Sequence, residues 1–462
     1  MELGSWKFII LNLFFSSILL IFARFMLDLR RGAILWSYVL VSIVFVYLLP
    51  VQQYSEHVSL DIILLSHILY ILYLIIVIII SRDYICHLEE IILITRNIPS
   101  GVMAGTICGW LALRFYLIAK YGAAALMFSR VQLTQGAGVV EFASWEVALS
   151  HITTLMLLGL FVTLTIQHAV RGGEGLGFFI IVTLIMLVVV VVTNESPIGS
   201  RRLVLVLAVL WSSVSWAYSG LPITGWIRKK RNIIILLTII FSSLSIYYHK
   251  IRGNNYTELL EARGGGEFVR ALSKFATTFE TAEDGEMVHF LRSGPFDFFV
   301  RVVDTWISED KSSGGAASAF SLAIAVPKAL YPGEKPVGDV DEVLLERLEI
   351  VPPTPFLYID YPTSLPAIGV ADFGPVGVVM AAIVLGTSYI LAGLFIKILS
   401  RNHFLFLIVL GLFIELIGSQ EAGLTSILSS LRDSFVAIMF FLPLYLIFRN
   451  IKDRINSMNN QL

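Results

Sequence analysis

Residues 59–81 read SLDIILLSHILYILYLIIVIIIS, and Asp61 is the one formally charged side chain in this run. About 20 apolar residues in a helix span the roughly 30 Å hydrocarbon core of a bilayer, so the run is long enough to cross a membrane. The whole chain has the same character, because 57% of its 462 residues are hydrophobic and its mean hydropathy is +0.82. A soluble domain carries fewer apolar residues. The sequence therefore predicts an integral membrane protein.

Ten further runs have a similar length and composition. They cover residues 6–28, 32–53, 100–119, 144–168, 176–193, 202–220, 232–250, 366–396, 403–419 and 433–449. Together with 59–81 they predict an all-α polytopic membrane protein with about eleven transmembrane helices. Gly374 and Pro375 lie inside the run 366–396. Because this pair interrupts a helix, we expect a kink or a re-entrant start there.

The interval 251–365 is polar and acidic, with 10 Lys and Arg against 18 Asp and Glu. Apolar runs on both sides anchor its two ends in the membrane. We therefore divide the chain into a bundle of about eight helices (1–250), a large, mainly helical extracytoplasmic loop (251–365), and about three helices with a cytoplasmic tail (366–462). Within the loop the pattern predicts a helix over Phe298–Ile307. Ser312–Gly315 has the composition of a flexible connector.

The distribution of cationic residues predicts the orientation in the membrane. Alternate short segments between the runs hold 14 Lys and Arg, and the other short segments hold six. Cytoplasmic segments carry the excess of positive charge. The tract Arg228–Arg231 contributes most to this bias. We therefore expect the N-terminus and the loop 251–365 outside, and the C-terminus in the cytoplasm.

Several chemistries lack the residues that they need. Cys86 and Cys108, the two cysteines, lie in a predicted inner segment and a predicted span, so the loop has neither a disulfide nor a thiol nucleophile. The eight histidines show no H-E-x-x-H or comparable ligand spacing, and we expect no metal site. Neither a Walker A nor a G-x-S-x-G sequence is present. Nucleotide hydrolysis and serine esterase chemistry are therefore not predicted.

One polar stretch on the predicted outer face has the composition of an anion site. Gly199 and Ser200 would leave backbone N–H groups available at a helix start, beside the guanidinium groups of Arg201 and Arg202. A diphosphate fits such an arrangement. Alternatively, these arginines and Arg432 reach the lipid headgroups and anchor helix ends. Both interpretations stay open at this point.

Motifs in the second half of the chain carry a family resemblance. They are PKALYPGEKP at 327–336, SLPAIG at 364–369, DFGPVG at 372–377 and LRDSF at 431–435. With Gly-Ser-Arg at 199–201 and the large outer loop, they resemble bacterial oligosaccharide repeat-unit polymerases, which include O-antigen and enterobacterial common antigen polymerases. The similarity of residues is confined to about 190–210 and 325–440, and it lies in the order and sidedness of the motifs. Arg202 departs from the family, where an apolar residue is expected.

The resemblance implies a glycosyltransferase at the outer face of the bacterial inner membrane. It would transfer a growing glycan from a polyprenyl diphosphate onto another lipid-linked repeat unit, without a cofactor or a metal. Its partners would be the lipid-linked oligosaccharide, membrane lipid and a co-polymerase that determines chain length. No nucleic acid partner is expected.

That reaction assigns roles to residues on the outer face. Positive charge stabilises a leaving diphosphate, and the implied cations are Arg201, Arg202, Lys328, Lys335 and Arg432. A carboxylate takes the proton of the attacking sugar hydroxyl, and the candidates are Asp360, Asp372, Asp433 and Glu421, each of which has a structural salt bridge as its alternative role. Tyr358 and Tyr361 would stack on sugar rings, or else belong to the interfacial aromatic belt. We expect one cavity at the outer leaflet, lined by Arg201, Arg432 and residues 358–377.

Two other functions fit parts of the pattern. A glycan ligase would use the same donor and a different acceptor. A transporter of lipid-linked oligosaccharides would also have many spans and outward cations, but it would show internal repeats and polar residues in the middle of its spans. Most spans here lack mid-membrane charges, with Glu146, His151 and Glu415 as the nearest exceptions.

Overall fold

The structure is a computed structural model of the whole chain. It describes residues 3–27, 32–43, 57–94, 98–121, 144–171, 180–186, 200–232, 295–327, 330–336, 340–350, 363–400 and 402–418, with short pieces at 234–239 and 423–443. Across these residues the regular secondary structure is helical. The predicted all-α class is therefore confirmed for the described part of the chain.

Twelve helices account for most of the described residues. They are α1 (Leu3–Met26), α2 (Ala33–Ser42), α3 (Leu60–Ile94), α4 (Ser100–Tyr121), α7 (Ser144–Arg171), α9 (Ser200–Ser219), α13 (Pro295–Ser308), α14 (Ala316–Ala325), α15 (Val340–Leu348), α16 (Leu365–Phe373), α17 (Pro375–Leu399) and α18 (His403–Gly418).

Five described helices are long and apolar enough to cross a membrane. They contain the segments Phe8–Met26, Leu60–Tyr84, Ser100–Tyr121, Ala148–His168 and Pro375–Leu399. Two lie within predicted spans, and the other three overlap predicted spans and extend two or three residues beyond them. Shorter apolar helices lie in the predicted spans 32–53, 202–220 and 403–419. The predicted runs 176–193, 232–250 and 433–449 lie largely outside the described residues. A membrane protein is thus supported, whereas the count of about eleven spans is not confirmed.

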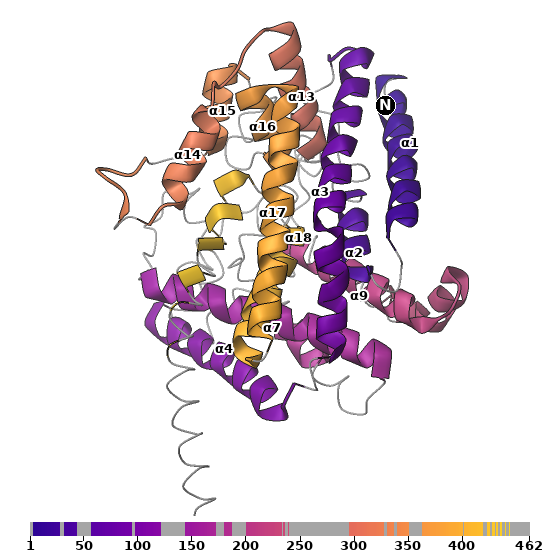
Figure 1. Cartoon of the computed structure of the whole chain (residues 1–462), viewed down its shortest axis with the longest axis vertical. Coiled ribbons are helices and arrows are strands. Elements are labelled where there is room, and N and C mark those ends of the chain that lie inside the picture. Colours follow the sequence, from indigo (N-terminus) through magenta and orange to yellow (C-terminus); the bar gives the residue numbers. More distant parts are fainter. Residues whose placement is uncertain are drawn as a thin grey trace, which may run out of the picture.

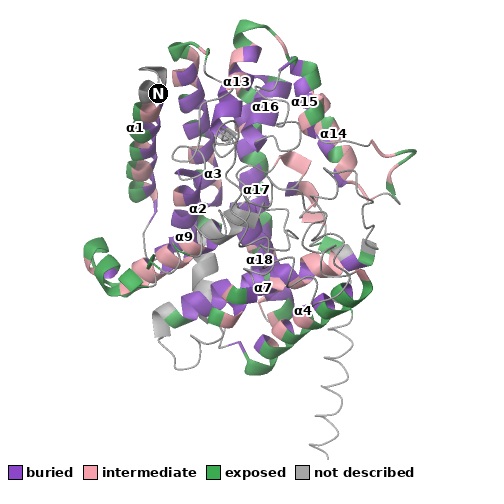
Figure 2. Cartoon of the chain, turned by 180° about the vertical axis from the view of Figure 1, so that it is seen from behind, coloured by how far each residue is buried: buried purple, intermediate pink, exposed green. Residues whose placement is uncertain are grey.

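The long helices run in two directions. Figure 1 shows α1, α3 and α17 along the length of the molecule, with α4 and α7 running across the lower ends of α3 and α17. Helices α13, α15 and α16 lie at the opposite end, where the N-terminal end of α1 also lies. Figure 2 shows the same two ends from behind. The described half of the predicted outer loop and the N-terminal end of α1 therefore share one end of the described structure. Helices α4 and α7, which flank another segment predicted to be outside, lie at the other end, so the orientation in the membrane stays a prediction.

A sharp break separates α16 from α17. Gly374 has φ +64°, and a Cβ at this position would collide with the Trp306 ring of α13. Pro375 then begins α17, where its missing N–H is not needed. Beyond the break, a Cβ on Gly377 would collide with the backbone of Gly369, so the two helices touch backbone to backbone. The predicted interruption at Gly374–Pro375 is confirmed.

Small residues also bring α7 and α18 into close contact. A Cβ on Gly159 would collide with the backbone of Leu407, and one on Gly411 would collide with the backbone of Leu155. Membrane helices commonly pack through such small residues because lipid supplies little hydrophobic drive for their association. This contact fixes how the polar residues of α7 and α18 face each other.

Part of the predicted outer loop belongs to the main core. Helix α13 covers the predicted Phe298–Ile307 helix and begins three residues earlier. Its residues Phe296, Phe299 and Val300 are fully buried in the same apolar cluster as α3 and α17. Helices α14 and α15 were not predicted, and residues 251–294 lie outside the described residues. The described half of the loop is therefore packed onto the bundle rather than separate from it.

Candidate functional site

Helix α14 is a short helix whose first turn lacks a cap of its own. Its sequence, AASAFSLAIA, carries no charge, and its N-cap is Gly315, which has φ +87° and no side chain. The first N–H groups of a helix have no partner within the helix and need an acceptor from elsewhere. In this structure the acceptor comes from α16.

Asp372 supplies the missing cap from the end of α16. Its Oδ2 accepts the Ser318 N–H at 2.8 Å, and its Oδ1 accepts the Ala317 N–H at 3.3 Å. The Ser313 hydroxyl also donates to Oδ1. Asp372 is only 5% exposed. A negative charge at this position also complements the positive end of the α14 dipole.

The turn before α14 is tied to the same helix end. The Ser312 hydroxyl donates to Ala371 O at 3.0 Å, and Ser313 N donates to the same carbonyl at 2.8 Å. Gly314 and Gly315 both have positive φ, which glycine adopts without strain. The prediction of a flexible connector at Ser312–Gly315 is therefore wrong. Gly314 and Gly315 instead belong to a defined turn, which Ser312 and Ser313 attach to the end of α16.

Two of the predicted cations meet at the other end of α14. Lys335 Nζ donates to Ile324 O at 2.7 Å. Arg432 Nη1 donates to Ala325 O at 3.0 Å, across 107 positions of sequence. The last carbonyls of a helix lack intrahelical partners and carry partial negative charge, so cations are favoured there. Lys335 and Arg432 are both half-buried. We call these two residues at the end of α14 the cation pair.

Exposed apolar side chains occur on α14 and on the segment that carries Lys335. Leu322 lies in the last turns of α14 and is 53% exposed. Leu330 is 74% exposed and precedes Lys335 in a segment that turns at Gly333, where φ is +99°. Cationic donors beside exposed aliphatic surface suit a ligand with an anionic head and an apolar tail.

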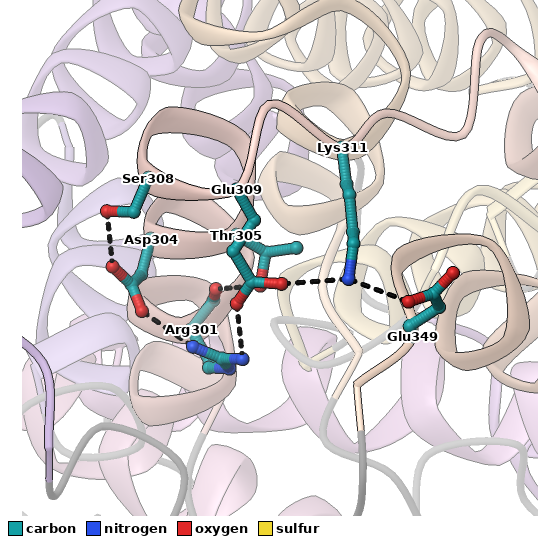
Figure 3. A network of polar contacts seen from close by, with 7 residues as sticks. All are labelled: Arg301, Asp304, Thr305, Ser308, Glu309, Lys311 and Glu349. Carbon is teal, nitrogen blue, oxygen red and sulfur yellow. Dashed lines mark hydrogen bonds and ion pairs between the residues drawn. The ribbon is translucent and has the colours of Figure 1, made fainter.

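An ion-pair network joins α13 to the ends of its neighbours (Figure 3). Arg301 bridges Asp304 at 2.6 Å and Glu309 at 2.7 Å. Lys311 bridges Glu309 at 3.0 Å and Glu349 at 2.8 Å. Hydrogen bonds from Lys311 and then the charge of Arg301 lower the pKa of Glu309, and bonds to Glu349 and Glu309 raise the pKa of Lys311. These side chains are partly or largely exposed, so the network positions the helices and contributes modestly to stability.

The other predicted site residues are placed as follows. Arg201 and Arg202 lie in the first turn of α9, which begins at Ser200 as the sequence predicted, and their side chains are outside the described set. Helix α9 packs against α2, α7 and α18, whereas α14 packs against α15 and α16. Outside the described residues lie Lys328, Tyr358, Asp360, Tyr361, Glu421 and Asp433. The single cavity that would unite Arg201 with Arg432 stays a prediction.

A second polar group lies at the opposite end of the molecule. Glu146 of α7 is 1% exposed and accepts bonds from Lys120 at 2.7 Å, Tyr121 at 2.6 Å and Tyr116 at 3.0 Å, all from α4. One turn further along α7, Ser150 accepts a bond from Arg114 at 3.0 Å. We call Glu146 and its three donors the Glu146 cluster.

A buried pair extends this polar region toward α18. His151 Nε2 lies 3.6 Å from Glu415 Oε2, and their side chains are 12% and 4% exposed. The sequence showed these charges as exceptions within spans, but it did not show that they meet. For the contacts between α7 and α4, the sequence did offer a signal, because Glu146 and Ser150 are four residues apart and therefore share one face of a helix. Among the described residues, no three His, Cys, Asp or Glu side chains gather as metal ligands.

Comparison of the chain with models of known families, with curated proteins and with solved structures finds no match. Functional conclusions therefore depend on the residues and contacts described above, together with the sequence motifs.

Proposed function

We propose that the chain is a glycosyltransferase that polymerises lipid-linked oligosaccharide repeat units at the outer face of the inner membrane. The observation that supports this most is the meeting of Lys335 and Arg432 at the end of α14. Both residues had been assigned to diphosphate binding from the sequence motifs, although they are far apart in the chain. Their convergence on consecutive carbonyls supports the proposal, because it brings two cationic groups to one helix end.

In the proposed reaction, the bond between the anomeric carbon of the donor glycan and its diphosphate oxygen breaks, and the electron pair leaves with the diphosphate. A hydroxyl oxygen of the acceptor repeat unit forms the new bond to that carbon. Its proton passes to a carboxylate or to the departing diphosphate. The products are a longer glycan on the acceptor lipid and free polyprenyl diphosphate, so atoms and charge balance.

The cation pair would bind the charge that develops on the leaving group. A guanidinium presents several N–H donors in a planar fork, and an ammonium presents three donors. The α14 carbonyls hold one donor of each group in a fixed direction. Donors positioned before the reaction stabilise developing charge without reorganisation. Exposed Leu322 and Leu330 would contact the polyprenyl chain of the same substrate.

The test is reconstitution of the purified protein in liposomes with lipid-linked repeat units. We expect a ladder of products that differ by one repeat unit. A single transfer to a different lipid acceptor would indicate a ligase instead. If no covalent product forms while the substrate crosses the bilayer, the glycosyltransferase proposal is wrong.

One observation favours a second candidate, a transporter of lipid-linked oligosaccharides. Transporters place ionisable residues inside the bundle. Glu146 and Glu415 are buried, and half-buried His151 of α7 faces Glu415 of α18. The liposome assay separates the two functions, because only the transferase consumes the donor.

A further inference from the structure

We propose that Asp372, a candidate base from its sequence motif, is instead a positioning residue that acts on the cation pair through α14. The inference rests on the proposed function, since the cation pair is its diphosphate site. Asp372 and the cation pair contact opposite ends of one ten-residue helix. We infer that the carboxylate sets where the C-terminal carbonyls of α14 hold Lys335 and Arg432.

The carboxylate oxygens of Asp372 are already engaged. Three donors contact them: the Ser313 hydroxyl and the N–H groups of Ala317 and Ser318. The residue is 5% exposed. These donors occupy three of the roughly four acceptor positions of a carboxylate, and a proton taken by either oxygen would weaken the cap of the first turn of α14. Proton acceptance and capping are therefore competing roles for this side chain.

Asp372 is also far from the place where the diphosphate would bind. An α-helix rises 1.5 Å per residue, so the N–H groups that Asp372 accepts and the carbonyls that hold the cation pair lie about 10 Å apart along α14. A general base must come within hydrogen-bond reach of the proton that it takes, directly or through one water. A base at Asp372 would act at the opposite end of α14 from the leaving group that Lys335 and Arg432 bind.

Helix α14 depends on its ends because it is short. Isolated helices below about 12–15 residues are marginal in water even with a favourable sequence. Here Asp372 closes the first turn and the cation pair closes the last. Loss of the Asp372 cap would fray α14 from its N-terminus and loosen the carbonyls of Ile324 and Ala325, to which the cations are bound.

Asparagine at position 372 separates the two roles. Asn caps helices about as well as Asp, and its amide oxygen, in the place of Oδ2, can accept the Ser318 N–H, while the longer Ala317 contact to Oδ1 is lost. Its NH2 group would face Ser313, whose hydroxyl can accept as well as donate. Asn cannot take a proton as a carboxylate does. A positioning role therefore tolerates Asp372→Asn, and a base does not.

The experiment compares Asp372→Asn, Asp372→Ala and Ser313→Ala, with exposed Glu349→Gln as the matched control. Steady-state polymerisation gives kcat and the KM for the lipid-linked donor. We expect Asp372→Asn to stay within about three-fold of wild type in both constants. Asp372→Ala should raise KM roughly ten-fold, the upper range for loss of a cap, with a smaller change in kcat. Ser313→Ala should shift KM in the same direction by less.

Hydrogen–deuterium exchange gives a readout that does not depend on catalysis. The Ser318 amide should lose protection in Asp372→Ala and keep it in Asp372→Asn. A large loss of kcat with unchanged KM in a folded Asp372→Asn would overturn the proposal in favour of a base. The proposal would also be overturned if Asp372→Ala had the same KM and the same amide exchange in α14 as the wild-type protein.

A failure of the proposed function would look different. If the wild-type protein forms no polymer, the transferase proposal is wrong, and affinity for polyprenyl diphosphate replaces KM as the readout. Weaker binding in Asp372→Ala, together with faster exchange in α14, would still support the positioning role. Equal binding in Asp372→Ala and wild type would overturn it.

Discussion

Asp372 and Glu146 are buried carboxylates at opposite ends of the molecule, and their donors differ. Asp372 accepts two backbone N–H groups and a serine hydroxyl, all neutral. Glu146 accepts two tyrosine hydroxyls and the ammonium group of Lys120. Neutral donors need an oxygen acceptor, whereas an ammonium group also needs the negative charge. A buried carboxylate therefore stabilises a helix end in one region, at Asp372, and compensates a cation in the other, at Glu146.

The largest effect expected from this comparison is that of Glu146→Ala. Two tyrosine hydroxyls, of exposed Tyr116 and half-buried Tyr121, would lose their acceptor, at about 0.5–1.5 kcal/mol each, and Lys120 would lose its counterion. We expect a markedly lower yield of folded protein and a clear drop in the thermal unfolding midpoint in detergent. Glu349→Ala removes a carboxylate that is 73% exposed and is the control. Equal midpoints for the two variants would contradict the account of the Glu146 cluster.

The amide variants of the two carboxylates should differ in thermal stability, by less than the effect of Glu146→Ala. Glu146→Gln keeps an oxygen for the tyrosines but removes the charge that faces Lys120, so it should destabilise the protein by part of the Glu146→Ala effect. Asp372→Asn keeps an acceptor for the Ser318 N–H and loses only the longer Ala317 contact and the smaller helix-dipole contribution, so it should unfold close to the wild-type temperature. Thermal unfolding of both purified variants in one detergent tests this. The reverse order would show that charge matters at Asp372 and not at Glu146.

The smallest effect should come from the exposed network of Figure 3. The pKa of Glu309 is lowered from 4.5, so its contribution to stability is complete above 4.5 and is lost as pH falls through its folded-state pKa. The pKa of Lys311 is raised from 10.5, so its contribution is complete below 10.5 and is lost as pH rises through the folded-state value. Lys311→Met should therefore lower the unfolding midpoint slightly and equally between about pH 6 and 9. The difference from wild type should shrink below pH 4.5 and in high salt.

A growing difference at acid pH would contradict this account of the network. Lys229→Met is a suitable control, because Lys229 is exposed and lies in the basic tract 228–231, away from these carboxylates. In Lys229→Met the unfolding midpoint should equal that of wild type across this pH range, with neither the small constant decrease nor its loss at low pH.

Features that depend on neighbouring residues were predictable from the sequence. The apolar run 59–81 became the first part of α3, and the glycine–proline pair at 374–375 became the break between α16 and α17. The amphipathic pattern of 298–307 became α13. In each case residues within a few positions determine the backbone, so periodicity and helix breakers carry enough information.

Features that depend on distant residues were not predictable in the same way. Helix α14 has an uncharged Ala- and Ser-rich sequence, and its cap comes from Asp372, 54 positions beyond Ser318. The glycines before α14 suggested flexibility because their composition does not reveal that positive φ is fixed by docking on α16. Lys335 and Arg432 were both candidates, but the carbonyls that bring them together could not be read from either motif.

The central claim is that Lys335 and Arg432 bind the diphosphate of a lipid-linked glycan. The most direct measurement is equilibrium binding of polyprenyl diphosphate to wild type, Lys335→Gln, Arg432→Gln and the double variant in nanodiscs, with Lys311→Gln as the control. Hydrogen bonds to charged groups contribute about 1.5–3 kcal/mol, so each site substitution should weaken binding roughly ten-fold or more. Binding of the uncharged polyprenol should not change. Equal affinity of the double variant and wild type for polyprenyl diphosphate would contradict the claim.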